Sequence, residues 1–311
     1  MIHSIAKRLL QALIMAWSVG TLTFVLVRTL PGDMAYKIAA SRYGDDAVST
    51  ASAAAVRAEL GLDSPAWQQY FHWLSNLITL DLGDSLVSGA PVVQELQHQL
   101  GYTLLLAVCA MLVSVIIAFP LGILSGARPS SAVDNSIMVG STFVRAQPVF
   151  SLGLLLIFLF AMELNWLPVA GFGEPRHLIL PALTLGLSLA AISNRIIRSS
   201  TINVLHSAYY QFARIKGMSR FSTFCRHGIR NILLPVIAFM GIQLIGLIEG
   251  VIMVESVFAW PGIGHGLSHA VFARDIPMLQ GAALVFGLMF VALNTLIDVC
   301  CARLDPRGVR Q

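Results

Sequence analysis

Long apolar runs alternate with short polar stretches along most of the 311-residue chain. A helix needs about 20 apolar residues to cross the hydrocarbon core of a bilayer, and six segments reach that length. Helices are expected in all of them, because backbone polar groups in lipid must be satisfied within the segment. The pattern therefore predicts an all-α polytopic membrane protein with six transmembrane helices, at about residues 9–30, 102–127, 136–162, 178–199, 232–255 and 278–302.

The composition supports this class. Hydrophobic residues make up 56% of the chain and charged residues 12%, with a mean hydropathy of +0.76. Soluble domains carry about 25% charged residues, so a large soluble core is excluded. The cysteines form no CxxC pair and lie in or beside apolar segments, which predicts buried thiols and no disulfide or metal site. They are Cys109, Cys225, Cys300 and Cys301.

The distribution of Lys and Arg predicts the orientation in the membrane. With a cytoplasmic N-terminus, 13 of the 20 basic residues fall in inner segments and five in outer segments. This bias agrees with the positive-inside rule, and six spans return the C-terminus to the cytoplasm. The net charge of +4 then reflects topology and contact with anionic lipid, and gives no reason to expect nucleic acid binding.

The spans divide the chain into three parts. Residues 1–30 are the N-terminal tail and first span, 31–99 an outer loop, and 100–311 a five-span core with a cytoplasmic loop at about 200–231. In the outer loop, AWQQYFHWLSNLITL predicts an amphipathic helix lying at the membrane surface. Trp67 and Trp73 are expected to anchor it among the lipid headgroups.

The cytoplasmic loop is unusually basic. Residues 213–235 carry five Lys and Arg side chains and no acid. Mixed apolar and polar positions predict a short amphipathic helix, a break at Gly217, and a second short helix. Two interpretations stay open from the residues alone: a basic surface against lipid headgroups, or a docking site for a cytoplasmic partner.

Ionisable residues inside spans are costly and mark candidate functional positions. Arg145 lies in the third span beside Gln147, and Glu249 and Glu255 lie in the fifth. Arg145 and Glu249 could form a buried ion pair or could line a translocation path, and the two can coexist. Glu255 is interpreted as a structural or gating residue that belongs to the same candidate path.

Other polar and small residues in the spans are given structural interpretations. Asp298 is expected to pair with a nearby base such as Arg303. Glycines in the fifth span suit close helix packing. They are Gly241, Gly246 and Gly250.

Two histidines, His265 and His269, are spaced i, i+4 after the fifth span. That spacing could bind a metal on one helix face, but no third ligand accompanies them, so no metal site is predicted. The chain has no GxxxxGK[ST] loop, and it is not expected to hydrolyse ATP itself. No Ser-His-Asp or zinc-protease pattern occurs, so an enzyme is not expected.

Several motifs, taken in their order along the chain, resemble one family, the permease subunits of bacterial ABC importers. The likeness is to B-type subunits of the dipeptide, oligopeptide and nickel subfamily, and it extends over nearly the whole chain. The cytoplasmic loop carries Ala213-x-x-x-Gly217 and the following RHGIRN and LLP, similar to the family's "EAA" loop. The other motifs are Leu30–Asp33, Leu60–Pro65, Leu82–Ser85, Phe172–Gly173, His177–Ala182, Phe258–Gly264, Asn294, Asp298 and Leu304–Arg307.

The resemblance implies the transmembrane domain of a type I ABC importer in the bacterial inner membrane. The cytoplasmic loop would then be a coupling helix seated on an ATP-binding subunit, although Gln211 and Phe212 stand where the general motif has Glu and Ala. The coupling residues implied are Ala213, Lys216, Gly217, Arg220, His227, Arg230 and Asn231, and the outer gate loop implied is Trp260, Pro261 and Gly262.

The family also implies partners. They are a second related permease subunit, two ATP-binding subunits and an outer substrate-binding protein. ATP and Mg²⁺ would bind those ATP-binding subunits, with no cofactor in this chain.

The expected cargo is short peptides, with nickel or a metal chelate as the alternative. A proton-coupled secondary transporter, with Glu249 or Asp298 as relay, would predict inverted repeats and broken helices, and neither is evident in the sequence. A membrane scaffold without transport activity would leave the ordered motifs unexplained.

Overall fold

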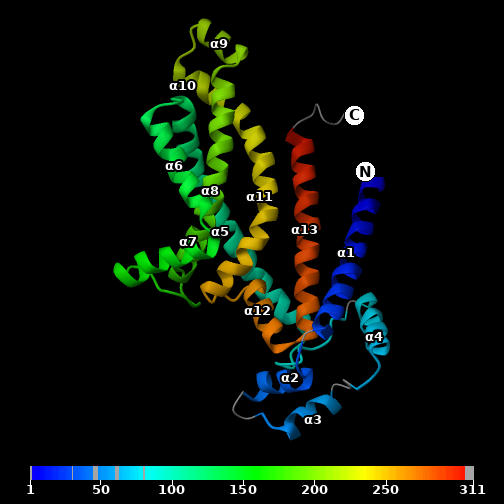
Figure 1. Cartoon of the computed structure of the whole chain (residues 1–311). Coiled ribbons are helices and arrows are strands. Elements are labelled where there is room, and N and C mark those ends of the chain that lie inside the picture. Colours follow the sequence, from blue (N-terminus) through cyan, green and yellow to red (C-terminus); the bar gives the residue numbers. More distant parts are fainter. Residues whose placement is uncertain (1, 30, 45–47, 60–62, 80, 305–311) are drawn as a thin grey trace. The chain divides into compact units, whose positions relative to one another are not determined.

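The computed structural model describes residues 2–29, 31–44, 48–59, 63–79 and 81–304 (Figure 1). The regular structure of these residues is helical apart from one isolated bridge between Asp84 and Pro91, which confirms the all-α prediction. The chain forms two compact units. One comprises residues 1–103 and 261–291, and the other comprises residues 104–260 and 292–311.

All six predicted spans lie on helices. Among the described residues, four helices are long and apolar enough to cross a membrane, or five if one bent pair counts as a span. The N-terminal segment contains a shorter apolar stretch, Leu10–Leu26. The helices that carry five of the predicted spans are α1 (Ile2–Thr29), α5 (Val92–Ala127), α8 (Arg176–Leu205), α11 (Ile229–Val257) and α13 (Ile276–Leu304).

The third predicted span is helical but is not one straight helix. Residues 136–162 fall on α6 (Ala132–Ala146), α7 (Val149–Leu156) and the π-helix η2 (Ile157–Glu163), with a bend of 106° after α6. Pro148 causes the break, because proline lacks an N–H and drives the preceding residue out of the helical region. Gln147 accordingly has φ −83° and ψ 135°.

In the first unit, the loop after α1 begins a compact pair of helices, α2 (Met34–Tyr43) and α3 (Thr50–Glu59). Asp33 caps α2 by accepting a hydrogen bond from the Ala35 N–H, and its other carboxylate oxygen pairs with Arg57 at 2.7 Å. The two helices enclose a small apolar core. Its buried members are Ala35, Ile38, Ala39 and Val56.

The same loop is tied to the turn between α12 (Ile263–Ala273) and α13. The Arg274 guanidinium donates to the carbonyl oxygens of Pro31 and Gly32, the latter at 2.8 Å. The neighbouring Asp275 is buried and accepts a hydrogen bond from Ser85 Oγ at 2.5 Å. Segments more than 180 residues apart in sequence are thereby joined within this unit.

The amphipathic helix predicted in the outer loop is present as α4 (Ala66–Ile78). Tyr70 lies against α1, where its hydroxyl lies 3.2 Å from Trp17 Nε1 and 2.9 Å from Thr21 Oγ1. Trp67 is 62% exposed, as a headgroup anchor requires. Trp73 was also expected to be an anchor, but its ring packs against Gly20 of α1, where the missing side chain leaves room for it.

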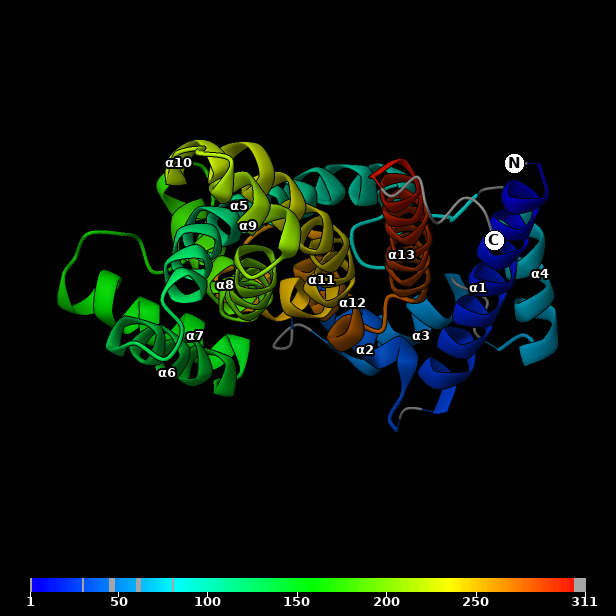
Figure 2. The same ribbon diagram turned by 90° about the horizontal axis from the view of Figure 1, so that it is seen from above.

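In the second unit, α8 lies between α6 and α11 in both views (Figures 1 and 2). The close contact between α5 and α8 depends on glycine. A Cβ at Gly122 of α5 would lie about 2.6–2.7 Å from Ile197, and a Cβ at Gly186 of α8 would lie about 2.5–2.7 Å from Val113. Of the three glycines expected to allow packing in α11, Gly241 lies against Ile297 and Gly250 against Leu185. Gly246 instead faces open space.

The buried core of this unit joins α5, α8 and α11 to a short helix, α9 (Ala208–Ile215). Tyr210 is the α9 residue in this cluster and is 8% exposed. The cluster consists of Ala118, Ala190, Ile197, Val204, Tyr210, Ile232 and Val236.

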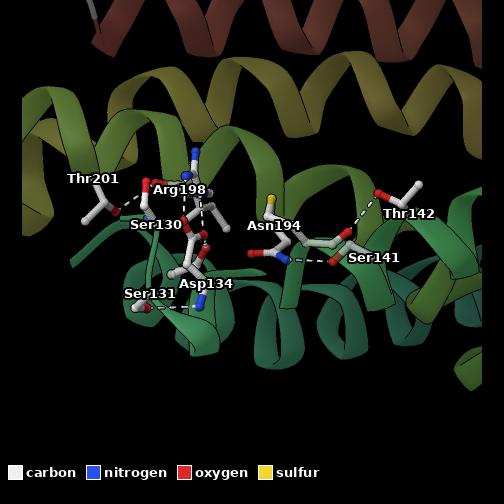
Figure 3. A network of polar contacts seen from close by, with 11 residues as sticks. Ser130, Ser131, Asp134, Ser141, Thr142, Asn194, Arg198 and Thr201 are labelled. Carbon is white, nitrogen blue, oxygen red and sulfur yellow. Dashed lines mark hydrogen bonds and ion pairs between the residues drawn. The ribbon is translucent and has the colours of Figure 1, made fainter. Parts of the chain in front are cut away.

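A polar network joins the start of α6 to α8 (Figure 3). Asp134 is 1% exposed and accepts bidentate hydrogen bonds from Arg198, both at 2.6 Å. It also accepts from Ser125 Oγ and from the Ser130 N–H. The carboxylate is thus saturated with donors, which is the condition under which a buried charge is tolerated.

The cysteines only partly follow the prediction of buried thiols. Cys109 is partly buried, but Cys225 is exposed in the π-helix η3 (Phe224–Gly228). The side chains of Cys300 and Cys301, the proposed Asp298–Arg303 pair and the motif residues 305–307 lie outside the described residues.

Replacing Asp134 with Ala is expected to lower the free energy of unfolding by about 3–5 kcal/mol, because it leaves a partly buried Arg198 without its carboxylate. The measurement is the thermal unfolding midpoint of the purified chain in detergent. Arg57→Ala is the matched control, since it removes an ion pair that is exposed on both sides and should cost about 0–1 kcal/mol. Equal losses in the two variants would contradict a supporting role for the Asp134 network.

Candidate functional site

A cleft of ≈ 640 Å³ opens in the second unit between the end of α6, the start of α7, and the middle of α8 and α11. Its volume lies in the range of about 300–1,000 Å³ that is usual for small-ligand sites. Its lining combines apolar side chains with several polar ones. The lining residues that carry polar side chains are Arg145, Gln147, Ser188 and Glu249.

Arg145 and Glu249 come to this cleft from different helices. Arg145 lies in the last turn of α6, and Glu249 lies in α11 beside Gly246 and Gly250, which also line the cleft. Both side chains are exposed, and no ion pair between these two described residues is present. The structure therefore brings the two charges to one cavity but does not show the ion pair that the sequence left open.

Of the other two candidate path residues, Gln147 lines the cleft and Glu255 does not. Gln147 lines the cleft at the break between α6 and α7. Glu255 is fully buried near the end of α11 and is not among the residues that line the cleft. The Glu255 side chain lies inside the helix packing, and its structural or gating role stays a prediction.

The basic loop forms the two short helices that its sequence predicts. Helix α9 ends at Ile215, Gly217 has φ +89°, and α10 spans Arg220–Thr223 (Figure 1). The backbone N–H of Gly217 bonds to the Arg214 carbonyl, and the Arg214 side chain donates to the Met218 carbonyl at 2.8 Å. The turn is therefore closed by local hydrogen bonds around a left-handed residue that favours glycine.

The loop continues into the next span without a break. Helix α10 leads through η3 into α11, and Pro235 lies inside α11. The loop helices are thus joined to α11 without an unwound linker. On the other side, α9 is held to the core by Tyr210.

An open groove of ≈ 830 Å³ lies between these short helices and the ends of α5 and α8. Its walls combine apolar side chains with Arg214 and Arg220, and Ile215 and Phe221 are 82% and 79% exposed. Exposed apolar groups flanked by cations are typical of a surface that receives a partner.

The coupling residues implied by the resemblance are divided between buried and exposed positions. Ala213 is buried, and the Asn231 side chain donates to the His227 carbonyl at 2.7 Å, so these residues shape the loop. His227 is partly buried. The residues with exposed side chains or backbone are Lys216, Gly217, Arg220 and Arg230.

The predicted outer gate loop is divided between the two units. In the second unit, Trp260 is 3% exposed and its ring meets Phe172 edge-on at 5.5 Å. In the first unit, Gly262 is the N-cap residue that precedes α12, and the N–H of Ile263 donates to Thr103 Oγ1 at 2.9 Å. Pro261 and Gly262 line a second, smaller pocket in that unit.

That second pocket, of ≈ 360 Å³, brings His265 and His269 together. Their Nε2 atoms lie 3.2 Å apart and their ring centroids 4.5 Å apart. Burial, and then the neighbouring His269, lower the pKa of His265 below its usual value. No group of three or more His, Cys, Asp or Glu in the described ranges has a geometry that could hold a metal ion.

Some residues of these sites were not identified from the sequence. Ser188 in the cleft, Tyr210 under the loop, and His98 and Gln99 in the histidine pocket carry no motif and are far from their partners in the chain. For Ser188, the one available signal was a polar residue within an apolar span.

Comparison with known proteins identifies the family. Residues 118–310 match the model of the binding-protein-dependent transport system inner membrane component, and residues 1–107 match the model of the N-terminal part of such membrane components. The glutathione transport system permease proteins GsiC of Pectobacterium atrosepticum and Escherichia coli K12 are 40% and 38% identical over 306 residues, covering 98% of each chain.

A solved amino acid ABC transporter, crystallised with histidines, has a similar fold. Its TM-score is 0.55 at 17% identity, and the match covers 68% of this chain and 94% of the other. At this identity the likeness concerns the fold alone. The family matches over nearly the whole length and the identity to the GsiC permeases show the family of this chain. It belongs to the binding-protein-dependent transport system inner membrane components, the multi-pass inner-membrane permeases of ABC importers.

Proposed function

We propose that this permease moves short peptides across the inner membrane and that the cleft lined by Arg145, Gln147 and Glu249 is part of the translocation path. The observation that carries the proposal is the pair of opposite, exposed charges in one cleft of ≈ 640 Å³. A peptide carries a carboxylate and an ammonium group. Arg145 can bind the carboxylate through two parallel hydrogen bonds, and Glu249 can accept from the ammonium group.

The relatives named as glutathione permeases support a peptide of this kind. Glutathione is a tripeptide with one ammonium group and two carboxylates, so it offers a partner to each charge in the cleft. Nickel or a metal chelate is the alternative cargo. The cleft offers a chelated metal one carboxylate and no imidazole, which is a poor ligand set for nickel.

The loop helices α9 and α10 are proposed as the element that receives an ATP-binding subunit. Helix α9 is fixed to the core by Tyr210, and α10 continues into α11, the helix that carries Glu249. About 16 residues of α8 separate Leu205 at the loop from Leu189 in the cleft, or about 24 Å at the helical rise per residue. A displacement at the loop can thus reach the cleft through continuous helix.

The remaining assignments follow from this arrangement. The distribution of basic residues supports a proposed orientation with both termini and the loop in the cytoplasm, and with α2–α4 and α12 on the outer side. The partners proposed are a second permease subunit, two ATP-binding subunits that hold ATP and Mg²⁺, and an outer substrate-binding protein. The chain itself is proposed to have no enzymatic activity and to bind no cofactor for transport.

The cargo is tested with the reconstituted full complex and its binding protein. Glutathione or other short peptides are expected to stimulate ATP hydrolysis, and nickel with histidine-like chelators is expected to leave the basal rate unchanged. The measurement is phosphate release at saturating binding protein. Stimulation by the nickel chelates alone would replace the peptide proposal with metal acquisition.

Arg145→Ala is expected to lower peptide uptake by about tenfold or more. The reason is that a hydrogen bond to a charged group contributes about 1.5–3 kcal/mol, and the variant loses it. Assembly should be unchanged, because Arg145 is exposed and has no ion-pair partner among the described residues. Uptake into proteoliposomes and the elution volume of the complex are the measurements. The control is Arg176→Ala, which removes an exposed arginine outside the cleft. Loss of assembly in Arg145→Ala would instead favour a structural ion pair between Arg145 and Glu249.

Gly217→Val is expected to uncouple ATP hydrolysis from uptake without preventing membrane insertion. The cause is the backbone, since φ is +89° and a β-branched residue disfavours it, whereas the surrounding space is open. Gly217→Asn is the matched variant, because asparagine tolerates a left-handed conformation and should keep most uptake. Wild-type uptake in Gly217→Val, with ATP hydrolysis measured in the same vesicles, would remove the coupling role.

A further inference from the structure

The histidine pocket belongs to the first unit, whereas the cleft proposed for the cargo belongs to the second. The pocket residues come from the turn at Ser85–Ser88, the start of α5, and α12. His265 and His269 are one helical turn apart and project from the same face of α12. We propose that this pair is the core of a binding site for a divalent transition metal ion such as Zn²⁺ or Ni²⁺.

The distance between the two imidazoles fits two ligands of one ion. Zinc–nitrogen bonds of about 2.0–2.1 Å place two ligand nitrogens about 3.3 Å apart in a tetrahedral site and about 2.9 Å apart in an octahedral one. The two Nε2 atoms are 3.2 Å apart, between these values. An ion can therefore bind both nitrogens with only a small change in the side chains.

A second observation in the pocket points to a ligand. The Gln99 side-chain oxygen is buried and has no hydrogen-bond partner among the described residues. The Gln99 side chain lies directly against Gly266, which follows His265 in α12, at a place where any larger residue would collide with it. An unpaired buried acceptor is costly, and a metal-bound water could donate to it.

The charges around the pocket favour a cation. Glu95 and Asp275 line it, and each accepts a hydrogen bond of 2.5 Å from a serine, Ser88 and Ser85 respectively. These hydroxyls orient the carboxylates and leave them other lone pairs for water bound to the ion. His98 lines the same pocket from α5.

The proposed site has two imidazole ligands, and water completes the coordination. It therefore has fewer protein ligands than a group of three or more, and the described ranges contain no such group. It does not depend on the proposed cargo, because its residues all lie in the first unit and the cleft lies in the second. Binding would fix α12 at the residues that follow Gly262 of the proposed gate loop.

The test uses the full-length chain in detergent with an affinity tag that contains no histidine. Zn²⁺ binding is measured by competition with a chromophoric chelator, and Co²⁺ absorption reports imidazole ligation. The double variant His265→Ala/His269→Ala is expected to weaken Zn²⁺ binding at least about tenfold, and Gln99→Leu about tenfold, as typical for a group that supports a ligand.

The matched control is His72→Ala/His206→Ala, which removes two histidines outside the pocket and should leave Zn²⁺ affinity unchanged. His269→Asn is a milder variant that keeps a polar side chain, and it should also lose the Co²⁺ signal while the unfolding midpoint without metal is unchanged. Equal Zn²⁺ affinity in wild type and the double variant would overturn the proposal, as would an equal loss in the control.

Discussion

The requirement that backbone polar groups in lipid be satisfied within the protein governs this structure. It explains why the described regular structure is helical, and it limits where a helix can break. Residues Gln147 and Pro148 leave the helix between α6 and α7, and both line the cleft of the second unit. Irregular backbone within a membrane is tolerated where it lines a cavity, and the break at Gln147 and Pro148 lines this cleft.

The cleft keeps its shape because the helices around it are tightly held. Glycines let α5 approach α8, and the bidentate Asp134–Arg198 pair joins α6 to α8 at the other end of α6 from Arg145. Tyr210 extends the same core to α9. The loop that is proposed to meet the ATP-binding subunit is thus attached to the helices that form the cleft.

Charged residues in or next to the spans take two different forms. Asp134 is buried and saturated with hydrogen bonds, which is the pattern of a structural group. Arg145 and Glu249 are exposed to one cleft and are not paired with each other, which leaves both charges available to a ligand. Burial and hydrogen bonding separate these roles, although all three residues are ionisable groups in or next to apolar segments.

The sequence alone determined the helical class, the positions of the six apolar segments, the two short helices around Gly217 and the family, because these depend on local composition, periodicity and ordered motifs. It also identified Arg145, Gln147 and Glu249 as candidates, since charged or polar residues within a span are costly wherever they point. Only the tertiary structure decided that these residues share a cleft, that Glu255 and Trp73 pack inward, and that Gln99 lines the pocket of the histidine pair. The physical reason is that the direction of a side chain is set by the helix packed against it, and that neighbour can lie more than 100 residues away in the chain.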